Sequence, residues 1–289
     1  MRIGIAVKPK LIEARETLAQ LSQWLRQRNV DAVWTTEAAL LGDGASLAVA
    51  DRAELPAQVD LVVVLGGDGT LLAMAKAIAE SGRDIPILAV NFGSLGFLTE
   101  VTRPEILSAL EAVISGQATH DLRMMLRATA TRQGQAPLSH FALNDVVFTR
   151  TALSRMIELS VSVGDQFVTT VKADGLIVAT PTGSTAYNLA AGGPIVHPSM
   201  DALVLTPIAP HMLTNRPIVI PTEREVRVRS TSSNAGDEVY VTVDGQTGFG
   251  LHEGDEIAIA KSERPLRLIR STTRSYFEVL RQKLKWNER

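Results

Sequence analysis

The 289-residue chain contains no cysteine, and this absence excludes several chemistries at once. Disulfide bridges, cysteine zinc centres, iron–sulfur clusters and thiol nucleophiles all need a thiol. Aromatic residues are scarce, at 4%. Neither sign of charge dominates, because 29 Lys and Arg stand against 31 Asp and Glu. The formal net charge of −2 argues against a strongly basic nucleic-acid binder, and no nucleic-acid partner is expected.

Long hydrophobic runs are also missing. Leu61–Leu65 and Ile85–Val90 are strand-length, whereas a membrane span needs roughly 20 apolar residues. The N-terminal sequence MRIGIAVKPK has no secretory apolar core or cleavage site, so we expect a cytoplasmic protein without a membrane partner. What is present is an ordinary globular composition, with 45% hydrophobic and 21% charged residues.

The first 120 residues alternate between strand-like and helix-like patterns. Asp60–Leu65 is apolar at consecutive positions, which predicts a strand buried on both faces, as in a parallel sheet. Thr70–Glu80 is rich in helix formers, and Ser81-Gly82 ends it. This order predicts a doubly wound, Rossmann-like α/β domain over residues 1–120. Further strands are expected at Arg2–Val7, Val30–Trp34 and Pro86–Val90, and further helices over Leu11–Leu25 and Pro104–Ile114.

From residue 121 the chain changes to short segments rich in β-branched residues, separated by Gly, Asp, Asn and Pro. This spacing predicts a β-rich domain over residues 121–270. The amphipathic stretch Ser275–Trp286 lies in a tail, residues 271–289, that we expect to pack back on the first domain. The expected strands are Leu126–Thr131, Phe141–Thr149, Met156–Val163, Val168–Val171, Leu176–Thr180, Glu225–Ser230, Val239–Val243 and Glu256–Ala260.

A glycine-rich loop, GGDGT, follows the buried strand and opens a helix, with Gly66, Gly67, Gly69 and Thr70 around Asp68. Glycines let backbone amides approach a ligand, and a helix start adds unpaired N–H groups and positive dipole. Together they predict a phosphate site. The loop is neither a Walker loop nor a dinucleotide fingerprint, because neither spacing is present.

Asp68 is unexpected in such a loop, since a carboxylate among phosphate-binding amides repels the ligand unless it has a role. It could accept a proton from an attacking hydroxyl, or hold a magnesium ion that bridges phosphates. The alternative is a plain Asp-Gly turn, because that dipeptide occurs four times, at Asp43, Asp68, Asp174 and Asp244. The strand–GGDGT–helix context favours the phosphate loop.

A second polar segment runs from Lys172 to Tyr187, with the sequence KADGLIVATPTGSTAY. An apolar strand leads into four hydroxyl residues within six positions, which suits ribose and phosphate oxygens. Tyr187 could stack on a base. The alternative is a Ser/Thr-rich turn that caps a helix.

These motifs together resemble the bacterial NAD kinases, from near residue 60 to the C-terminal YFEVLRQKL. The hydroxyl-rich segment and AGGPI carry most of the resemblance, whereas GGDGT is shared with diacylglycerol, sphingosine and phosphofructo-kinase relatives. The resemblance implies an NAD kinase/diacylglycerol kinase-like fold. The remaining motifs are NFGSLGFL at 91–98, Asn144-Asp145, TPIAP at 206–210 and NRPI at 215–218.

The resemblance implies transfer of a phosphoryl group from ATP to the 2′-hydroxyl of the adenosine ribose of NAD. Asp68 matches the proton acceptor and Gly69 an adjacent substrate contact. Asn144 and Asp145 match a pair that holds NAD, although many members have Glu in place of Asp145, whose reach is shorter. Asp174 matches a binding carboxylate.

The remaining implied contacts lie at basic, polar or backbone positions. Lys172 stands where many members have Arg, and so loses a bidentate fork. The resemblance also implies Mg²⁺, carried mainly by ATP with no protein ligand assigned, and a homodimer or homotetramer. The further implied contact residues are Arg155, Thr185, Ala186, Tyr187, Asn188, Leu189, Ala190, Ala209 and Gln246.

Two other functions remain open at this point. A related GGDGT-type kinase that acts on a lipid or sugar would keep the phosphate loop but has no use for the hydroxyl-rich segment. A nucleotide-binding regulator without turnover would not need Asp68, Asn144 and Asp174 together. No histidine of the chain shows metal-ligand spacing.

Overall fold

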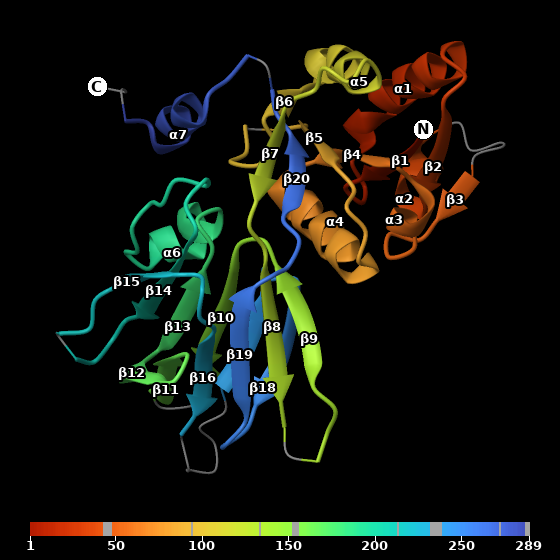
Figure 1. Ribbon diagram of the computed structural model, residues 1–289. Helices are drawn as coiled ribbons and strands as arrows, with labels where there is room; N and C mark the ends of the chain where they lie inside the picture. Colours follow the sequence, from red (N-terminus) through yellow and green to blue (C-terminus); the bar gives the residue numbers. More distant parts are fainter. Residues whose placement is uncertain are drawn as a thin grey trace. The chain divides into compact units, whose positions relative to one another are not determined.

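The computed structural model describes residues 1–42, 48–93, 95–132, 134–151, 156–212, 214–231, 239–271 and 273–286. The chain forms two compact units, shown in Figure 1. Unit 1 comprises Met1–Leu122 and Leu266–Arg289, and unit 2 comprises Arg123–Pro265. Each unit has its own hydrophobic core. The expected α/β fold followed by a β-rich half is confirmed.

Unit 1 is built on an eight-stranded sheet with the order β3-β2-β1-β4-β5-β20-β7, and β6 pairs with β5. Its first five strands are parallel. All six residues of β4 are buried, as the apolar run predicted. The strands are β1 (Arg2–Val7), β2 (Asp31–Thr35), β3 (Ala48–Ala50), β4 (Leu61–Gly66), β5 (Ile87–Asn91), β6 (Val101–Thr102), β7 (His120–Arg123) and β20 (Leu266–Ile269).

Helices cover both faces of this sheet, which is the doubly wound arrangement (Figure 1). Leu18 and Leu21 of α1 and Leu110 of α5 pack on the face that carries Leu61, Val63 and Leu65, and α3 and α4 pack on the other face. The helices are η1 (Ile12–Ala14), α1 (Arg15–Gln27), α2 (Thr36–Leu41), α3 (Leu55–Gln58), α4 (Asp68–Ser81), η2 (Arg103–Glu105), α5 (Ile106–Ile114) and α7 (Tyr276–Leu284).

The C-terminal segment returns to unit 1. β20 pairs in parallel with β5 through Leu268 and Ile87. From the sequence, residues 266–269 were expected to belong to the β-rich domain. An apolar run shows that a strand forms but does not say which sheet takes it. Helix α7 follows, with a capping box between Ser275 and Glu278.

Unit 2 is a sandwich of two six-stranded antiparallel sheets around one core. The first sheet has the order β15 (Ile218–Pro221), β14 (Ala202–Ile208), β13 (Gly175–Ala179), β10 (Asp145–Arg150), β17 (Val239–Val243), β18 (Thr247–Leu251). The second has the order β12 (Gln166–Ala173), β11 (Ile157–Val163), β16 (Val226–Ser230), β19 (Glu256–Lys261), β8 (Leu126–Thr131), β9 (Leu138–Ala142).

The hydroxyl-rich segment leaves β13 and covers the outer face of the first sheet. It contains η3 (Gly183–Thr185) and α6 (Tyr187–Ala190). Val196, which follows it, packs on Val147 and Ile177 of the sheet. The expected single strand Phe141–Thr149 is instead two strands, β9 and β10, separated by Leu143-Asn144. No described helix has the length and apolar character needed to cross a membrane.

Candidate active site

The phosphate loop lies at the carboxyl edge of the parallel sheet in unit 1. From β1 the chain winds outward to β2 and β3 on one side, and β4 and β5 lie on the other. The winding direction therefore changes between β1 and β4, and open α/β sheets bind ligands at such a point. GGDGT directly follows β4, so the topology places it there.

Helix α4 starts within the loop. Its N-cap, Gly67, has an extended backbone and no side-chain cap, so no capping side chain competes with an anion for the N–H groups at the start of the helix. The space beside the Cα atoms of Gly67 and Gly69 is open for at least 4 Å. Thr70, by contrast, is buried and its side chain lies against Gly66. The loop therefore offers backbone amides to a ligand.

The carboxylate of Asp68 is held by a distant loop. Its Oδ2 accepts a hydrogen bond from Phe97 N–H at 2.9 Å, and its Oδ1 accepts from Leu98 N–H at 3.3 Å and Thr99 N–H at 3.1 Å. The Thr99 hydroxyl donates to Oδ1 as well, at 3.0 Å. Each carboxylate oxygen has about two acceptor sites, so Oδ2 retains capacity for one more donor.

Two further residues, Gly96 and Asn91, determine how this loop receives the Asp68 carboxylate. A Cβ at position 96 would collide with Asp68 Oδ1 and Thr99 Oγ1, so any residue other than glycine would displace these side chains. The Asn91 amide donates to Thr99 Oγ1 at 2.9 Å and thereby orients the hydroxyl toward Asp68. The NFGSLGFL motif thus forms the seat of the Asp68 carboxylate.

Lys8 is a residue that the sequence interpretation missed. It follows β1 at the winding change, its N–H donates to Leu65 O at 2.9 Å, and its Cβ lies beside Gly66. Lys8 is exposed. A cationic residue beside a phosphate loop suits a phosphate ligand, and its position after the first strand of a doubly wound sheet was the available signal.

In unit 2, the Asn144-Asp145 turn and the start of the hydroxyl-rich segment come together. Thr180 N–H donates to Asn144 O at 2.8 Å, and the Thr180 hydroxyl donates to Leu143 O at 2.6 Å. A Cβ at Gly183 would collide with the Asn144 backbone, so glycine lets the segment lie directly against the turn.

Asp244 holds the Asn144-Asp145 turn in place through hydrogen bonds. The sequence analysis did not predict this role of Asp244. Its Oδ2 accepts from Leu143 N–H at 2.7 Å, and its Oδ1 accepts from Asn144 N–H at 2.8 Å and Asp145 N–H at 3.0 Å. The expected Asp244-Gly245 hairpin turn is also present, with Gln246 N–H donating to Val243 O at 2.9 Å. Gln246 therefore belongs to the hairpin turn that begins beside Asp145, where Asp244 N–H donates to Asp145 O at 3.0 Å. Its side chain is exposed.

The two carboxyl groups of Asp145 and Asp244 influence each other. Burial, together with the charge of Asp244, raises the pKa of Asp145 to about 7. Burial also raises the pKa of Asp244, but its three backbone donors favour the ionised form. Both carboxyl groups therefore hold a proton to a higher pH than an exposed aspartate does, and the three backbone donors offset part of this effect at Asp244.

Most hydroxyls of the TPTGSTAY segment bond within the protein. Thr180, Ser184 and Thr185 donate to the carbonyls of Leu143, Pro181 and Thr182. The Ser/Thr-turn alternative thus describes these side chains, which fix the shape of the segment. Asn188 is fully buried and its amide bonds to Ser184 O, Pro194 O and Thr206 Oγ1.

Exposure distinguishes the remaining residues of the segment. Tyr187 and Ala190 are exposed, and Ala186 and Leu189 are half-buried. The Tyr187 ring is 45% exposed, so it remains accessible to a stacking partner. The roles of Thr185 to Ala190 in nucleotide contact stay predictions.

The other predicted residues lie at the opposite end of β13. Asp174 precedes this strand and Thr180 follows it, and six residues of strand span about 20 Å. Asp174 accepts from Arg150 Nε at 2.8 Å, and its N–H donates to Ile208 O, beside Ala209. Lys172 pairs with Glu158 at 2.7 Å. Arg155 lies outside the described residues.

No three or more His, Asp or Glu side chains gather as a potential metal site in the part of the chain that the structure describes.

A doubly wound unit with a phosphate loop and a β-sandwich with a hydroxyl-rich segment define a two-domain nucleotide-binding protein. Sequence families narrow this class further. The family model of the ATP-NAD kinase N-terminal domain matches residues 3–118. The family model of the ATP-NAD kinase C-terminal domain matches residues 143–271. The chain therefore belongs to the NAD kinase family.

Individual relatives agree with this assignment. The NAD kinase of Syntrophotalea carbinolica is 46% identical over 289 residues, covering 100% of this chain and 99% of that protein. The NAD kinase of Geotalea daltonii is 47% identical over 93% of each chain. Among solved structures, yeast NADH kinase complexed with NADH has a TM-score of 0.87 and 27% identity, covering 100% of this chain and 89% of that chain. An NAD kinase from Archaeoglobus fulgidus in complex with ATP has a TM-score of 0.76 and 25% identity, covering 99% of each chain.

Proposed function

We propose that this chain is an NAD kinase, which transfers the γ-phosphoryl group of ATP to the 2′-hydroxyl of the adenosine ribose of NAD. One observation carries the proposal. Asp68 stands at the open N-terminus of α4, held by three backbone N–H groups, with acceptor capacity left on Oδ2. Such a site combines a phosphate cradle with a positioned proton acceptor.

The reaction follows from these parts. A ribose hydroxyl is a poor nucleophile, and Asp68 assists it by taking its proton as the new O–P bond forms. The bond between the γ-phosphorus and the β–γ bridging oxygen breaks, and ADP leaves with the electron pair. The backbone amides of Gly67 and Gly69, together with Lys8, face the phosphates and balance their charge. Mg²⁺ would be carried by ATP, since the described residues gather no metal site, and it would add to the neutralisation of phosphate charge.

Unit 2 is proposed to recognise NAD. Asn144 supplies an amide, and Asp145 supplies a carboxyl group that can donate or accept near neutral pH because burial and Asp244 raise its pKa. The exposed ring of Tyr187 suits stacking on a base. We place the protein in the cytoplasm as part of this proposal, since ATP and NAD are both available there.

The deciding experiment incubates the pure protein with ATP, Mg²⁺ and NAD, and detects NADP with a strictly NADP-dependent dehydrogenase. We expect NADP to form in the wild type and to fall sharply in Asp68→Asn. Parallel reactions replace NAD with diacylglycerol or a sugar. Phosphorylation of either, with no NADP, would favour the related kinase instead. Binding of NAD without any turnover would favour the regulator.

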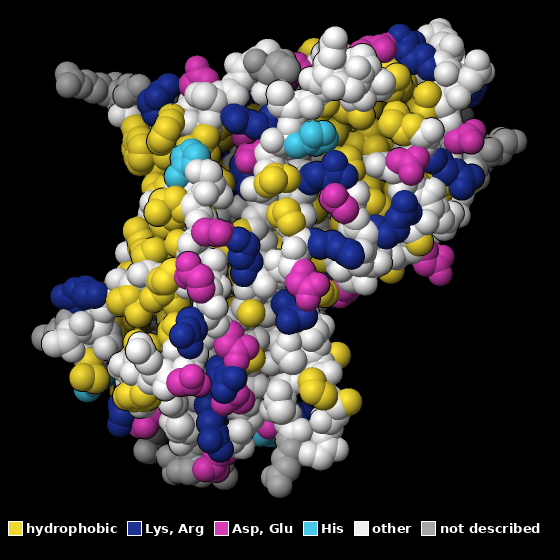
Figure 2. All heavy atoms as spheres, viewed as in Figure 1, with side chains coloured by type: hydrophobic (Ala, Val, Ile, Leu, Met, Phe, Trp, Pro, Cys, Tyr) yellow, Lys and Arg dark blue, Asp and Glu magenta, His cyan; other side chains and the backbone are white. Residues whose placement is uncertain are grey.

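We also propose a homo-oligomer, dimer or tetramer, whose active sites use two chains. The separation of about 20 Å between Asp174 and Thr180 supports it, because one ligand site cannot easily include both ends of β13. Phe167 of edge strand β12 and Val219 of edge strand β15 are 66% and 48% exposed. Figure 2 shows hydrophobic side chains gathered where β15 lies in Figure 1. Exposed apolar edges suit burial against a second copy.

Mixing an inactive variant with a weakened one, at an NAD concentration below the KM of the weakened variant, tests shared sites. In a hybrid of Asp68→Asn with Asp174→Ala, one site would combine the intact Asp68 of one chain with the intact Asp174 of the other. We expect partial recovery of activity after subunit exchange. A fully active monomer in light scattering, or exchange without recovery, would refute shared sites while leaving the kinase proposal untouched.

A further inference from the structure

The loop that seats Asp68 is itself held by the C-terminal segment of the chain. This loop, residues 97–100, provides the three backbone N–H groups that bind the Asp68 carboxylate. The mechanism above depends on the position of that carboxylate but does not explain what fixes the loop. The next contacts outward come from residues 273–283, which lie about 170 positions later.

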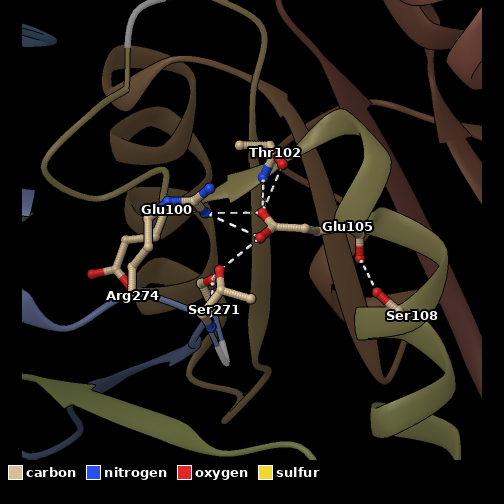
Figure 3. Close-up of polar contacts among 7 residues, drawn as sticks. Glu100, Thr102, Glu105, Ser108, Ser271 and Arg274 are labelled. Carbon is tan, nitrogen blue, oxygen red and sulfur yellow. Dashed lines mark hydrogen bonds and ion pairs between the residues drawn. The ribbon is translucent and has the colours of Figure 1, made fainter.

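Arg274 reaches the C-terminal end of this loop. Its Nη1 donates to Glu100 O at 3.1 Å and to the two carboxylate oxygens of Glu105 at 3.1 and 3.0 Å. Figure 3 shows Arg274 and Thr102 approaching the Glu105 carboxylate. Charge-assisted hydrogen bonds of this kind are stronger than neutral ones, and a guanidinium holds a fixed planar geometry.

Glu105 also links the region after the 97–100 loop to the C-terminal segment, because it accepts hydrogen bonds from both Thr102 and Thr273. Its Oε2 accepts from both the backbone N–H and the hydroxyl of Thr102 at 2.7 Å, and its Oε1 accepts from the Thr273 hydroxyl at 2.7 Å. Burial by itself would raise the pKa of Glu105, but the hydrogen bonds from Thr102, Thr273 and Arg274 outweigh it and lower the pKa to about 2. The carboxylate thus stays ionised and paired at every pH at which the protein would be assayed.

The other end of the loop has a contact from helix α7. Lys283 Nζ lies 5.6 Å from the centroid of the Phe97 ring, within the range of a cation–π interaction. Phe97 is the residue whose N–H binds Asp68 Oδ2, the oxygen that retains acceptor capacity. The C-terminal segment therefore touches both ends of residues 97–100.

We propose that the C-terminal segment positions the Asp68 carboxylate through the 97–100 loop, with Arg274 as the principal positioning residue. The inference rests on the proposed role of Asp68. Arg274 acts through other residues: it fixes Glu100, and the loop amides then fix Asp68. Positions of reacting groups matter steeply, since a displacement of about 1 Å can cost roughly 10²-fold in rate.

The test compares Arg274→Gln with a matched control, Arg267→Gln. Arg267 lies in β20 of the same segment and also donates to a carboxylate and a carbonyl, with Nε 2.7 Å from Asp84 Oδ1 and Nη2 3.0 Å from Asp84 O. We expect Arg274→Gln to lower kcat roughly ten- to hundredfold, with the KM values for ATP and NAD within about twofold of wild type. Arg274→Lys should recover part of the loss, and Arg267→Gln should leave kcat unchanged.

A double variant separates positioning from general damage to the fold. If Arg274 acts through Asp68, adding Arg274→Gln to Asp68→Asn should cost less than about twofold more. Losses that multiply in full would overturn the proposal, as would a rise in KM that accounts for the whole effect.

Hydrogen exchange keeps this inference distinct from the kinase proposal. Backbone amides of a peptide that spans residues 92–102 should exchange faster in Arg274→Gln than in wild type or Arg267→Gln. This readout does not need turnover, so it stands even if no NADP forms. Unchanged exchange in Arg274→Gln would directly refute the proposal that Arg274 holds the 97–100 loop in place.

Discussion

Two carboxylates, Asp68 in unit 1 and Asp244 in unit 2, are held in the same way but stand in different surroundings. Each begins an Asp-Gly pair, and each accepts three backbone N–H groups from a loop distant in sequence. Asp68 stands at a helix N-terminus, next to an open glycine loop. Asp244 stands next to a second carboxyl group, Asp145.

The surroundings, rather than the anchoring, therefore distinguish the roles proposed for the two carboxylates. Asp68 keeps an acceptor site on Oδ2, which suits the proposed proton transfer. Asp244 accepts hydrogen bonds from the backbone of residues 143–145, and its charge adds to the burial that raises the pKa of Asp145. We expect substitution in unit 1 to reduce the chemical step, and substitution in unit 2 to change stability and NAD recognition.

The largest effect is expected for Asp68→Asn. Loss of a general base typically costs 10²–10⁴-fold, so kcat should fall by roughly that factor. The fold should persist, because Asn keeps one oxygen to accept from the loop amides. Steady-state assays of the folded variant at saturating ATP and NAD give kcat, and circular dichroism checks the fold. A kcat near the wild-type value would show that Asp68 is not the base.

The next effect concerns stability in unit 2. The pKa of Asp145 is raised from 3.8 to about 7 by burial and the charge of Asp244, so the folded protein binds a proton that the unfolded chain has released between these values. The free energy of unfolding should therefore fall as pH rises from about 4 to 7. Asp145→Asn lacks this proton and should gain stability relative to wild type over that window, by up to about 4 kcal/mol.

Thermal unfolding at pH 5 and pH 8 measures this difference. Hydrogen exchange in peptides that contain β10 would locate the change in unit 2. Asp201→Asn is the matched control, because Asp201 is an exposed unit 2 carboxylate paired with Lys261. An Asp145→Asn variant whose stability relative to wild type is the same at both pH values would contradict the raised pKa of Asp145.

Two glycines sharpen the comparison at a smaller scale. A Cβ at Gly96 meets the side-chain oxygens of Asp68 and Thr99, whereas a Cβ at Gly183 meets the backbone of Asn144. A side chain can rotate away, so Gly96→Ala should displace the Asp68 carboxylate and lower kcat roughly tenfold with little loss of stability. A backbone cannot, so Gly183→Ala should destabilise unit 2 by about 1–3 kcal/mol.

Gly250→Ala serves as the control for both substitutions, since no atom lies within 4 Å of its would-be Cβ. Activity and melting temperature, measured on all three variants, separate the two outcomes. A loss of stability in Gly96→Ala as large as that in Gly183→Ala would remove the proposed distinction between the two carboxylate seats.

The sequence predicted local features well. Consecutive apolar residues gave β4, and helix formers that end at Gly82 gave α4, which the structure ends at Ser81 with Gly82 as its C-cap. β14 was missed, and it contains Pro207, which usually argues against a central strand. The structure explains the exception, because β15 pairs only with Ala202–Leu205 and ends before the proline.

Long-range partners could not be predicted. Asp68 stood out because a carboxylate in a phosphate loop is unusual within five residues of sequence. Arg274 bonds to Glu105 across 169 positions, and Asp244 bonds to Asn144 across 100, and neither pairing leaves a local pattern. The hydroxyl-rich segment was predicted to suit ribose and phosphate oxygens, whereas in the structure Thr180, Ser184 and Thr185 donate to backbone carbonyls.

The smallest effect is expected for Asp174→Ala, at the end of β13 remote from the Asp244 anchor. Asp174 is about two-fifths exposed and pairs with Arg150, so removing it should cost little stability. If it recognises NAD, the loss of one charged hydrogen-bond partner should raise the KM for NAD roughly tenfold and leave the KM for ATP nearly unchanged. Asp201→Ala, which removes another exposed, ion-paired carboxylate of unit 2, should change neither constant. Steady-state kinetics with each substrate varied in turn measure both values. Equal increases in the two KM values, or an increase for ATP alone, would mean that Asp174 does not distinguish NAD, and would restrict NAD recognition to the Asn144 end of the strand.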